Sequence, residues 1–503
     1  MFSVMRSLRA AVPARSELTL ILGASAFAPA MIVVNNPESP GITSAALVTV
    51  GIALLALTVR AVFVVSGASP AGATSAVATA VFVLANTGFV AESVAMGRWF
   101  IVAFTGLASW VIYRFRDLKI VDMAITAGTL ILILTPVVTW VSNLDDAVVH
   151  ASMNGIGLVQ FGTQPDVVVI VADGYASTSV LDEFYSYDNH DFTEQLHSLG
   201  FQVVQAMTSN YGRTALSIPS FLQLDYVLED SVVGRSARRT MLDVLSGENN
   251  LVDIMRSNGY HTVYVESGWL GTKCAASNDV CVHGPWPDET LYDIVHRSAF
   301  GGLPGFEAGM SFARGSIHSM TWLDHELDRY LGNEQPDFIY VHVLAPHPPM
   351  FLDSACRLEA DEGVAGFAVG MPGLSESELD TRRDAYVEQV NCVNEHLGRA
   401  ARKAADSGAI ALILADHGPD QGSQMYVDGD AWNAAQRRER FGILLAVLHD
   451  GCDYGDLVSL VNVSRRMIAC LSDTQIPSLT DRYFDLSRSE GESVVIELAD
   501  AGS

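Results

Sequence analysis

The stretch "PDVVVIVADGY" (residues 165–175) decides the fold of this chain. An unbroken run of apolar, mainly β-branched residues lies between Pro165 and Gly174. Such a run is typical of a strand that is buried on both faces of a parallel sheet. A single acidic residue, Asp173, follows where the strand would end.

Similar short runs recur downstream, and helical patterns separate them. The runs cover residues 261–267, 337–346, 409–418 and 441–448, and the helical patterns include residues 251–259 and 382–408. Alternating strands and helices predict an α/β domain with a largely parallel sheet over residues 165–503. Residues 142–164 read as a polar connector that precedes it.

Upstream of the connector, residues 1–141 read as a helical transmembrane domain. A bilayer core about 30 Å thick needs roughly 20 apolar residues per helix. About five candidate spans meet this need, at residues 18–34, 45–65, 73–90, 99–113 and 120–141. The alternative for the first span is a cleaved signal peptide, but the further spans favour an uncleaved membrane domain.

The cations give this membrane domain an orientation. Arginines precede the first span at residues 6–15, and Arg114, Arg116 and Lys119 lie between the fourth and fifth spans. Because Lys and Arg are retained in the cytoplasm, an even number of spans separates the two groups. The sequence therefore predicts a multi-pass protein of the cytoplasmic membrane, with the N-terminus inside and the α/β domain outside.

Cysteine usage agrees with export. All six cysteines lie after the membrane domain, and an even number in an oxidising compartment indicates up to three disulfides. Six cysteines allow fifteen pairings, and six free thiols are the alternative. Sequence order favours pairing Cys274 with Cys281, Cys356 with Cys392 and Cys452 with Cys470.

Charge excludes one class of partner. Through Val141 the chain has 8 basic and 5 acidic residues of 30 and 57 in total, which leaves 22 and 52 beyond it, a net charge of −30. A domain this acidic repels polyanions, so nucleic acid is not an expected partner.

Polar residues of one chemical kind follow three of the predicted strands. Asp173 ends the first, His347 follows the strand at 337–346, and Asp416 and His417 end the strand at 409–418. Ligands bind at the carboxyl ends of parallel strands, and these residue types favour a divalent metal. A single Asp at a strand end is more often a cap, but three strands ending in metal-ligand residue types indicate a site.

The segment "NYGRTALSIPS" (residues 210–220) supplies a hydroxyl group for that site. Thr214 begins a predicted helix, where a hydroxyl is usually an N-cap. Free amides and the positive dipole end also hold anions at such a place. A metal-activated Thr214 could therefore attack a phosphorus or sulfur centre.

Together, "VVVIVADG", "TALSIPS" and "LILADHG" resemble, in order and spacing, the sulfatase-like branch of the alkaline phosphatase superfamily. The pattern Thr-Ala-x-Ser-Ile-Pro is similar to the nucleophile segment of membrane phosphoethanolamine transferases. Five spans followed by an exported catalytic domain resemble the layout of lipoteichoic acid synthases.

The resemblance implies a role for each matching residue. Asp173, Thr214, Asp416 and His417 would be ligands of one divalent cation, zinc or manganese, with Thr214 also the nucleophile. His347 would lie near the substrate phosphate or leaving group, where it protonates the leaving alcohol or binds a second cation.

Three neighbouring residues are weaker candidates, each with a structural alternative. Arg213 could clamp a phosphoryl oxygen or be a solvated arginine. Trp269 could line a glycerol or sugar pocket, although core packing is the better expectation. His342 is expected to be a packed core histidine.

Two departures limit what can be transferred. The ethanolamine-phosphate and glycerol-phosphate transferases carry Glu where this chain has Asp173, as sulfatases and phosphodiesterases do. Sulfatases that form formylglycine need Arg two residues after their Pro, where this chain has Phe221. An aldehyde-dependent sulfatase is therefore not expected.

The sequence thus favours a membrane-anchored, metal-dependent phosphotransferase. It would move a phospho-alcohol group from a membrane phospholipid to an envelope glycan or lipid through a phospho-threonine. The first alternative is a sulfatase-like hydrolase, a phosphodiesterase or sulfuric ester hydrolase. The second is a non-catalytic membrane binding protein.

Overall fold

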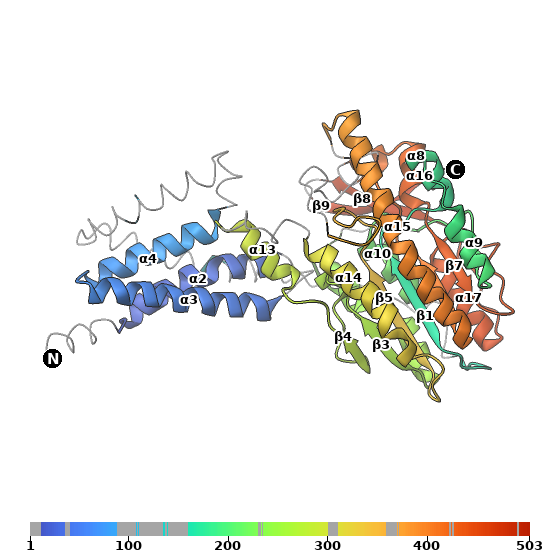
Figure 1. Cartoon of the computed structure of the whole chain (residues 1–503), viewed down its shortest axis with the longest axis horizontal. Helices are drawn as coiled ribbons and strands as arrows, with labels where there is room; N and C mark the ends of the chain where they lie inside the picture. The colour runs from blue at the N-terminus through green and yellow to red at the C-terminus, as the bar shows by residue number, and fades with distance from the viewer. Residues whose placement is uncertain are drawn as a thin grey trace. The chain divides into compact units, whose positions relative to one another are not determined.

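The structure is a computed structural model of the whole chain (Figure 1). The residues that it describes are 12–35, 41–87, 159–229, 235–299, 310–358, 372–421, 427–489 and 492–502, with a few single residues between these stretches. The chain forms two compact units, one of residues 1–145 with 287–310 and one of residues 146–286 with 311–503. The expected division near residue 142 therefore has an exception, because residues 287–310 group with the N-terminal unit.

The N-terminal unit contains three long apolar helices, α2 (Arg15–Asn35), α3 (Ile42–Val65) and α4 (Pro70–Ala85). Among the described residues, 15–34 and 42–65 form helices long and apolar enough to cross a membrane, and α4 is shorter. Large apolar side chains of α3 are exposed, with Leu54 and Val62 at 60% and 61%. The expected spans at 99–113 and 120–141 lie almost entirely outside the described residues.

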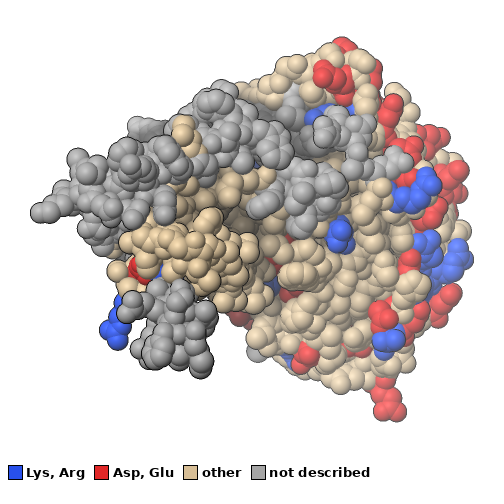
Figure 2. Space-filling model, turned by 60° about the vertical axis from the view of Figure 1, so that its left-hand side comes forward, with Lys and Arg blue, Asp and Glu red and all other residues tan. Residues whose placement is uncertain are grey.

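One buried arginine of this helical unit is paired inside it. Arg60 of α3 is buried, and its guanidinium pairs with Glu17 of α2 at 2.5 Å and donates to Thr74 of α4 at 2.7 Å. Figure 2 shows few charged side chains on the described surface of this unit and more of them along the right-hand border of the other unit. An apolar exterior with a paired internal arginine is the pattern that a lipid environment favours.

The second unit is built on a seven-stranded sheet in the order β2-β7-β6-β1-β5-β3-β4. The strands are β1 (Val167–Ala172), β2 (Gln202–Val203), β3 (His261–Val265), β4 (Val280–Val282), β5 (Asp337–Val343), β6 (Ile410–Leu414) and β7 (Leu445–Leu448). The pairs of β1, β3, β4, β5 and β6 are parallel, and β7 pairs antiparallel with both β6 and β2. The predicted, largely parallel α/β sheet is thus confirmed, and all five predicted strands form.

The central strand has the burial that its sequence predicts. Every residue of β1 is buried, with β5 on one side and β6 on the other. In the view of Figure 1, α14 (Met310–His325) and α15 (Glu376–Ser407) cross in front of the strands. The other helices of this unit are α8 (Thr178–Tyr185), α9 (His190–Ser198), α10 (Thr214–Gln223), α11 (Arg235–Leu245), α12 (Asn250–Ser257), α16 (Ala434–Phe441) and α17 (Val461–Ser472).

Three disulfides and a C-terminal hairpin complete the second unit. The three disulfides Cys274–Cys281, Cys356–Cys392 and Cys452–Cys470 are the pairs that sequence order favoured. A C-terminal hairpin of β8 (Tyr483–Ser489) and β9 (Glu492–Leu498) was not predicted. It packs Phe484 and Val495 into a core with Tyr211 and Leu216, which flank the start of α10.

Candidate active site

Asp173 lies where β1 stops. Its backbone N–H still donates to Val343 at 2.9 Å, and the chain then turns at Gly174, whose φ of +70° suits glycine. The Asp173 side chain is buried. Its Oδ2 is 3.3 Å from His342 Nε2, and its Oδ1 is 3.6 Å from His417 Nε2. The end of β1 therefore delivers one carboxylate into the interior of the site.

Asp416 and His417 follow β6, the strand next to β1, and both side chains are buried. Asp416 Oδ1 accepts from the Gly174 N–H at 2.9 Å, and its Oδ2 is 3.2 Å from His417 Nε2. The Nδ1 of His417 lies 2.9 Å from the Gly418 carbonyl oxygen. A proton on Nδ1 satisfies that carbonyl, so the lone pair of Nε2 faces the carboxylates.

Thr214 is the first residue of α10, and Arg213 before it has extended backbone angles. The Thr214 Oγ1 lies 3.2 Å from His417 Nε2. The helix is fixed to the sheet because the Ser217 hydroxyl donates to the Asp416 carbonyl at 2.6 Å. Ser217 is buried and its hydroxyl is engaged there, so Thr214 is the hydroxyl that faces the site.

His347 lies in the loop that follows β5. Its ring centroid is 5.7 Å from that of His417, and one ligand atom each of His347, Asp173 and His417 lie within 4.8 Å of one another. Its Nδ1 is bonded to the Pro348 carbonyl, which leaves Nε2 for the site. A Cβ at Gly174 would lie 3.4 Å from the His347 Cα, so a larger residue there would crowd this loop.

The His347 loop, defined as residues 346–356, is held by α15. The Gln389 side chain accepts from the N–H groups of Phe351 and Leu352 at 3.1 and 3.2 Å. The same amide donates to the carbonyls of Pro346 and His347 at 3.1 and 3.4 Å. Gln389 is 2% exposed, so one buried side chain satisfies four backbone groups of the loop.

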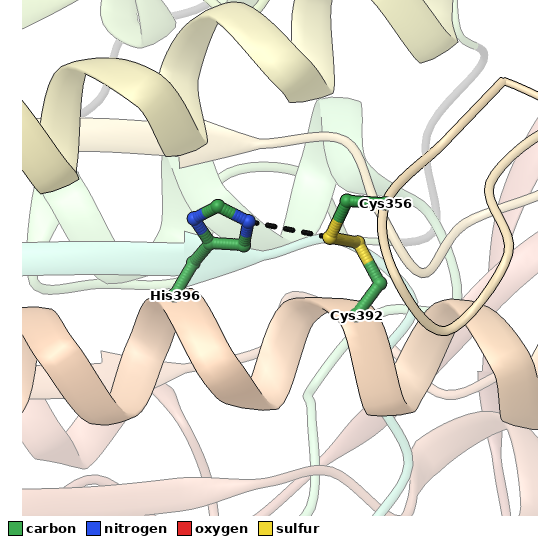
Figure 3. Close-up of side chains that lie close together, drawn as sticks. All are labelled: Cys356, Cys392 and His396. Atoms are coloured by element: carbon green, nitrogen blue, oxygen red, sulfur yellow. Dashed lines mark hydrogen bonds between the residues drawn. A yellow bond between two sulfur atoms is a disulfide. The ribbon is translucent and has the colours of Figure 1, made fainter.

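One turn further along α15, a disulfide closes the same loop (Figure 3). His396 Nε2 lies 3.2 Å from the sulfur of Cys356, which is bonded to Cys392. These three residues could be mistaken for a metal-binding group. Because the two sulfurs are already bonded to each other, the group acts as a tether of the His347 loop.

The four predicted ligands fit a divalent cation. Asp173 Oδ1 and Asp416 Oδ2 are buried without a hydrogen-bond partner, and both face His417 Nε2. Unsatisfied buried carboxylate oxygens are costly, and a cation is the group that would satisfy both at once. Two carboxylates, one imidazole and a hydroxyl are ligand types that zinc and manganese accept.

The pKa shifts of the two carboxyl groups also favour a cation between them. Burial, followed by the charge of Asp173, raises the pKa of Asp416 to about 7. Burial also opposes ionisation of Asp173, but His347, His342 and His417 outweigh it and lower its pKa below 3.8. The two carboxylates therefore do not ionise together readily in the protein alone, and a cation between them would remove the repulsion.

Burial favours the neutral form of the two imidazoles that face the carboxylates. Burial lowers the pKa of His347, and burial followed by the charge of Arg440 lowers the pKa of His417 well below 6.5. A neutral imidazole is the form that binds a metal or accepts a proton.

The two predicted substrate-binding residues lie in different surroundings. Arg213 Nε donates to the buried Asp485 at 3.3 Å, and its side chain remains 23% exposed next to Thr214. Trp269 follows β3, two strands from β1, and its indole lies over Gly271 in the same turn. The structure thus places Arg213 next to Thr214 and gives Trp269 a local packing partner.

Sequence reasoning missed three residues that build the site. Gln389 holds the His347 loop, and His342, expected only to pack in the core, is fully buried with its Nε2 directed at Asp173. Arg440 is buried in α16 and donates to the carbonyls of Gly212 and Gly418, each at 2.8 Å. Of these three residues, only His342 stands out in the sequence, because it is a polar residue among the apolar residues of β5.

This fold and side-chain set define a sulfatase-like hydrolase or transferase of the alkaline phosphatase superfamily. Residues 165–445, more than half of the chain, match the family named Sulfatase, and the chain belongs to that family. The predicted superfamily and enzyme class are thereby confirmed. No curated protein matches the chain.

Solved structures give weaker likenesses. The zinc complex of the periplasmic domain of EptC from Escherichia coli has a TM-score of 0.41 at 13% identity, covering 64% of this chain and 90% of that one. The integral membrane lipooligosaccharide phosphoethanolamine transferase A from Neisseria meningitidis has 0.39 at 14%, covering 92% and 97%. A putative sulfatase from Bacteroides thetaiotaomicron has 0.40 at 11%, covering 65% and 79%. With TM-scores below 0.5, these likenesses carry no argument about substrate or ligands.

Proposed function

We propose that this protein is a membrane-anchored, metal-dependent phosphotransferase with Thr214 as its nucleophile. It would take a phospho-alcohol group from a membrane phospholipid and pass it to a hydroxyl of an envelope glycan or lipid. One observation carries the proposal: Thr214 Oγ1 and His417 Nε2 are 3.2 Å apart at the start of α10, beside two unpaired buried carboxylate oxygens.

Asp173, Thr214, Asp416 and His417 would hold one zinc or manganese ion. When bound, the cation would lower the pKa of the Thr214 hydroxyl and neutralise charge on the phosphoryl oxygens. The orphaned oxygens of Asp173 and Asp416 support this assignment because a cation would satisfy both. The alternative to a single ion is a pair of ions, with the second cation bound near His347, Asp173 and His417.

The covalent step would proceed at Thr214. Its Oγ forms a bond to phosphorus while the bond from phosphorus to the leaving alcohol breaks, and the threonine proton passes to a neighbouring base. The N–H groups at the start of α10 would face the phosphoryl oxygens, and Arg213 directly precedes this helix. Its hydrogen bond to Asp485 fixes the Arg213 side chain through Nε, which leaves the outer nitrogens for a substrate oxygen.

His347 would act as the general base in the second half-reaction and as the general acid in the first. With Nδ1 bonded to Pro348, its neutral Nε2 can accept the proton of the incoming acceptor hydroxyl. In the first half-reaction it would give a proton to the leaving alcohol, once the anionic substrate has raised its pKa.

The apolar N-terminal helices support a membrane location. Of the described residues, 15–34 and 42–65 are long and apolar enough to span a bilayer, and α3 exposes large apolar side chains. The three disulfides favour an oxidising compartment for the catalytic unit. A catalytic domain tethered in this way reaches a donor that stays in the plane of the membrane.

Hydrolysis is the second candidate function, and one observation favours it. Asp173 stands at the first metal position, and the shorter side chain is the one typical of sulfatases and phosphodiesterases. Water, instead of an alcohol, would then resolve the phospho-threonine.

The test is intact-mass analysis of the full chain in lipid vesicles after removal of metal and reloading with zinc or manganese. Vesicles of phosphatidylethanolamine or of phosphatidylglycerol serve as donors. We expect a metal-dependent mass increase that maps to Thr214 and is absent from Thr214→Ala. Thr381→Ala, at an exposed threonine of α15, is the matched control and should retain the adduct.

Three outcomes separate the candidates. An adduct released by a sugar or glycerol acceptor supports transfer, and release that incorporates labelled oxygen from water supports hydrolysis. A chain that binds neither metal nor phosphoryl group would overturn both enzyme functions.

A further inference from the structure

One helix of the N-terminal unit comes from the middle of the catalytic sequence. Helix α13 (Glu289–Arg297) follows β4 in the chain, yet it packs against α2, α3 and α4. Its Ile294 joins Ile32 and Ala45 in a common apolar cluster. The chain therefore passes between the two units three times, after residues 145, 286 and 310.

The contact of α13 with the helices is specific. The Ser44 hydroxyl donates to the Asp288 carboxylate at 2.6 Å, and the Ala299 N–H donates to the Leu84 carbonyl at 2.8 Å. A Cβ at Gly41 would lie 2.0 Å from Thr290 Oγ1, so only glycine permits this approach. Hydrogen bonds at both ends of α13, and the close approach of Gly41 to its first turn, describe a fitted contact.

All of these contacts lie at one end of the helical unit. They involve the end of α2 at Ile32, the start of α3 at Gly41 and Ser44, and the end of α4 at Leu84. Arg15, at the start of α2, lies at the opposite end, and the buried Arg60 lies near that end in α3. In the topology that the sequence predicts, where cations mark the cytoplasmic side, α13 would lie at the outer end of the unit.

Two side chains next to this contact suit the boundary between lipid and water. Trp286, two residues before Asp288, is 70% exposed. Arg297 is exposed at the last position of α13, where a cation can meet lipid phosphates. Tryptophan is enriched at the headgroup level of membranes because its ring is apolar and its N–H is polar.

We propose that Trp286 and α13 form a second membrane attachment of the catalytic domain, seated among the phospholipid headgroups of the outer leaflet. The inference rests on the membrane location in the proposed function and deepens it. Attachment at residues 286 and 310, in addition to the connector after residue 145, would restrict how far the catalytic domain can move from the lipid surface.

The test uses the native tryptophan in the full chain, reconstituted into phosphatidylcholine and phosphatidylglycerol vesicles. The emission of Trp286 is obtained as the difference between the native protein and Trp286→Phe. Lipids brominated near the top of the acyl chain quench tryptophans at the boundary, and iodide quenches those in water. Trp432→Phe gives the matched control, because Trp432 is 3% exposed within the catalytic unit.

We expect brominated lipid to reduce the Trp286 difference emission by about half, with little effect of iodide, while Trp432 responds to neither. Ile294→Asp, which breaks the α13 contact, should move Trp286 from lipid quenching to iodide quenching. Iodide quenching of Trp286 in the native protein, without lipid quenching, would overturn the inference.

Failure of this inference can be told apart from failure of the proposed function. An alkaline wash that releases the chain from the vesicles would refute the membrane location itself. A chain that is retained in the vesicles, with Trp286 in water, would refute only the second attachment. The assay for the Thr214 adduct is independent of both readings.

Discussion

Replacing Arg440 with methionine should damage both stability and metal binding. Arg440 is 3% exposed and donates to the carbonyls of Gly212 and Gly418, each at 2.8 Å. Gly212 is two residues before Thr214, and Gly418 follows His417 directly. One guanidinium therefore joins the nucleophile segment to the metal-ligand segment.

The magnitude follows from those two bonds. A hydrogen bond that involves a charged group contributes about 1.5–3 kcal/mol, and an unsatisfied buried carbonyl costs a similar amount. The Gly418 carbonyl keeps its bond from His417 Nδ1, so the full loss falls mainly on Gly212. We expect Arg440→Met to lower the free energy of unfolding by about 3–5 kcal/mol, and metal affinity to fall roughly 10- to 100-fold.

The assay compares two arginines of the same helix. Arg438 pairs with Glu183 at the surface and is 40% exposed, so Arg438→Met should cost under about 1 kcal/mol. Urea unfolding of the full chain in detergent gives stability, and competition with a chelator gives zinc affinity. If Arg440→Met loses no more stability than Arg438→Met, or binds zinc as the native chain does, the reasoning is refuted.

The remaining predictions concern the surroundings of the site. Gln389→Leu removes four hydrogen bonds to the His347 loop and should slow phosphoryl transfer about tenfold or more. Zinc affinity should not change, because none of these four bonds goes to a proposed metal ligand. An equal loss of zinc affinity would contradict this prediction. Replacing both Cys356 and Cys392 with serine should lower the free energy of unfolding by about 2–4 kcal/mol. The loss should exceed that of the same change at Cys274 and Cys281, because the first disulfide closes a loop of 36 residues and the second a loop of 7. Urea midpoints that show an equal or larger loss for the Cys274–Cys281 change would contradict this reason. Burial raises the pKa of Asp324, but the hydrogen bonds and charges of Arg399 and His396 together outweigh burial and lower that pKa below 3.8. The folded state therefore gains stability from this group above pH 3.8 and loses it as the pH falls through the lowered pKa, and Asp324→Asn should flatten the acid limb of the urea midpoint against pH.

The central sheet was predictable because burial leaves a mark in the sequence. Strands β1, β3, β5, β6 and β7 are continuous apolar runs, and each forms within the predicted range. The hairpin of β8 and β9 was not predicted, because "YFDLSRS" has no apolar run and pairs chiefly with its neighbour in the chain. Helix α13 posed a different difficulty. Its pattern marks an amphipathic helix, but nothing in nine residues tells which unit supplies the apolar surface that it covers.

The residues of the candidate site also fall into two groups, those that the sequence predicts and those that it does not, and the difference has a physical cause. Asp173, Asp416 and His417 end apolar strands, so the topology of a parallel sheet alone brings them to one edge. Arg440 and Gln389 hold that edge in shape by bonding to backbone carbonyls and N–H groups, which every residue carries. Such bonds impose no residue type on their partners and leave no pattern in the sequence. Candidate ligands at strand ends can therefore be proposed from one sequence, whereas the side chains that position them become visible only when distant segments are placed together.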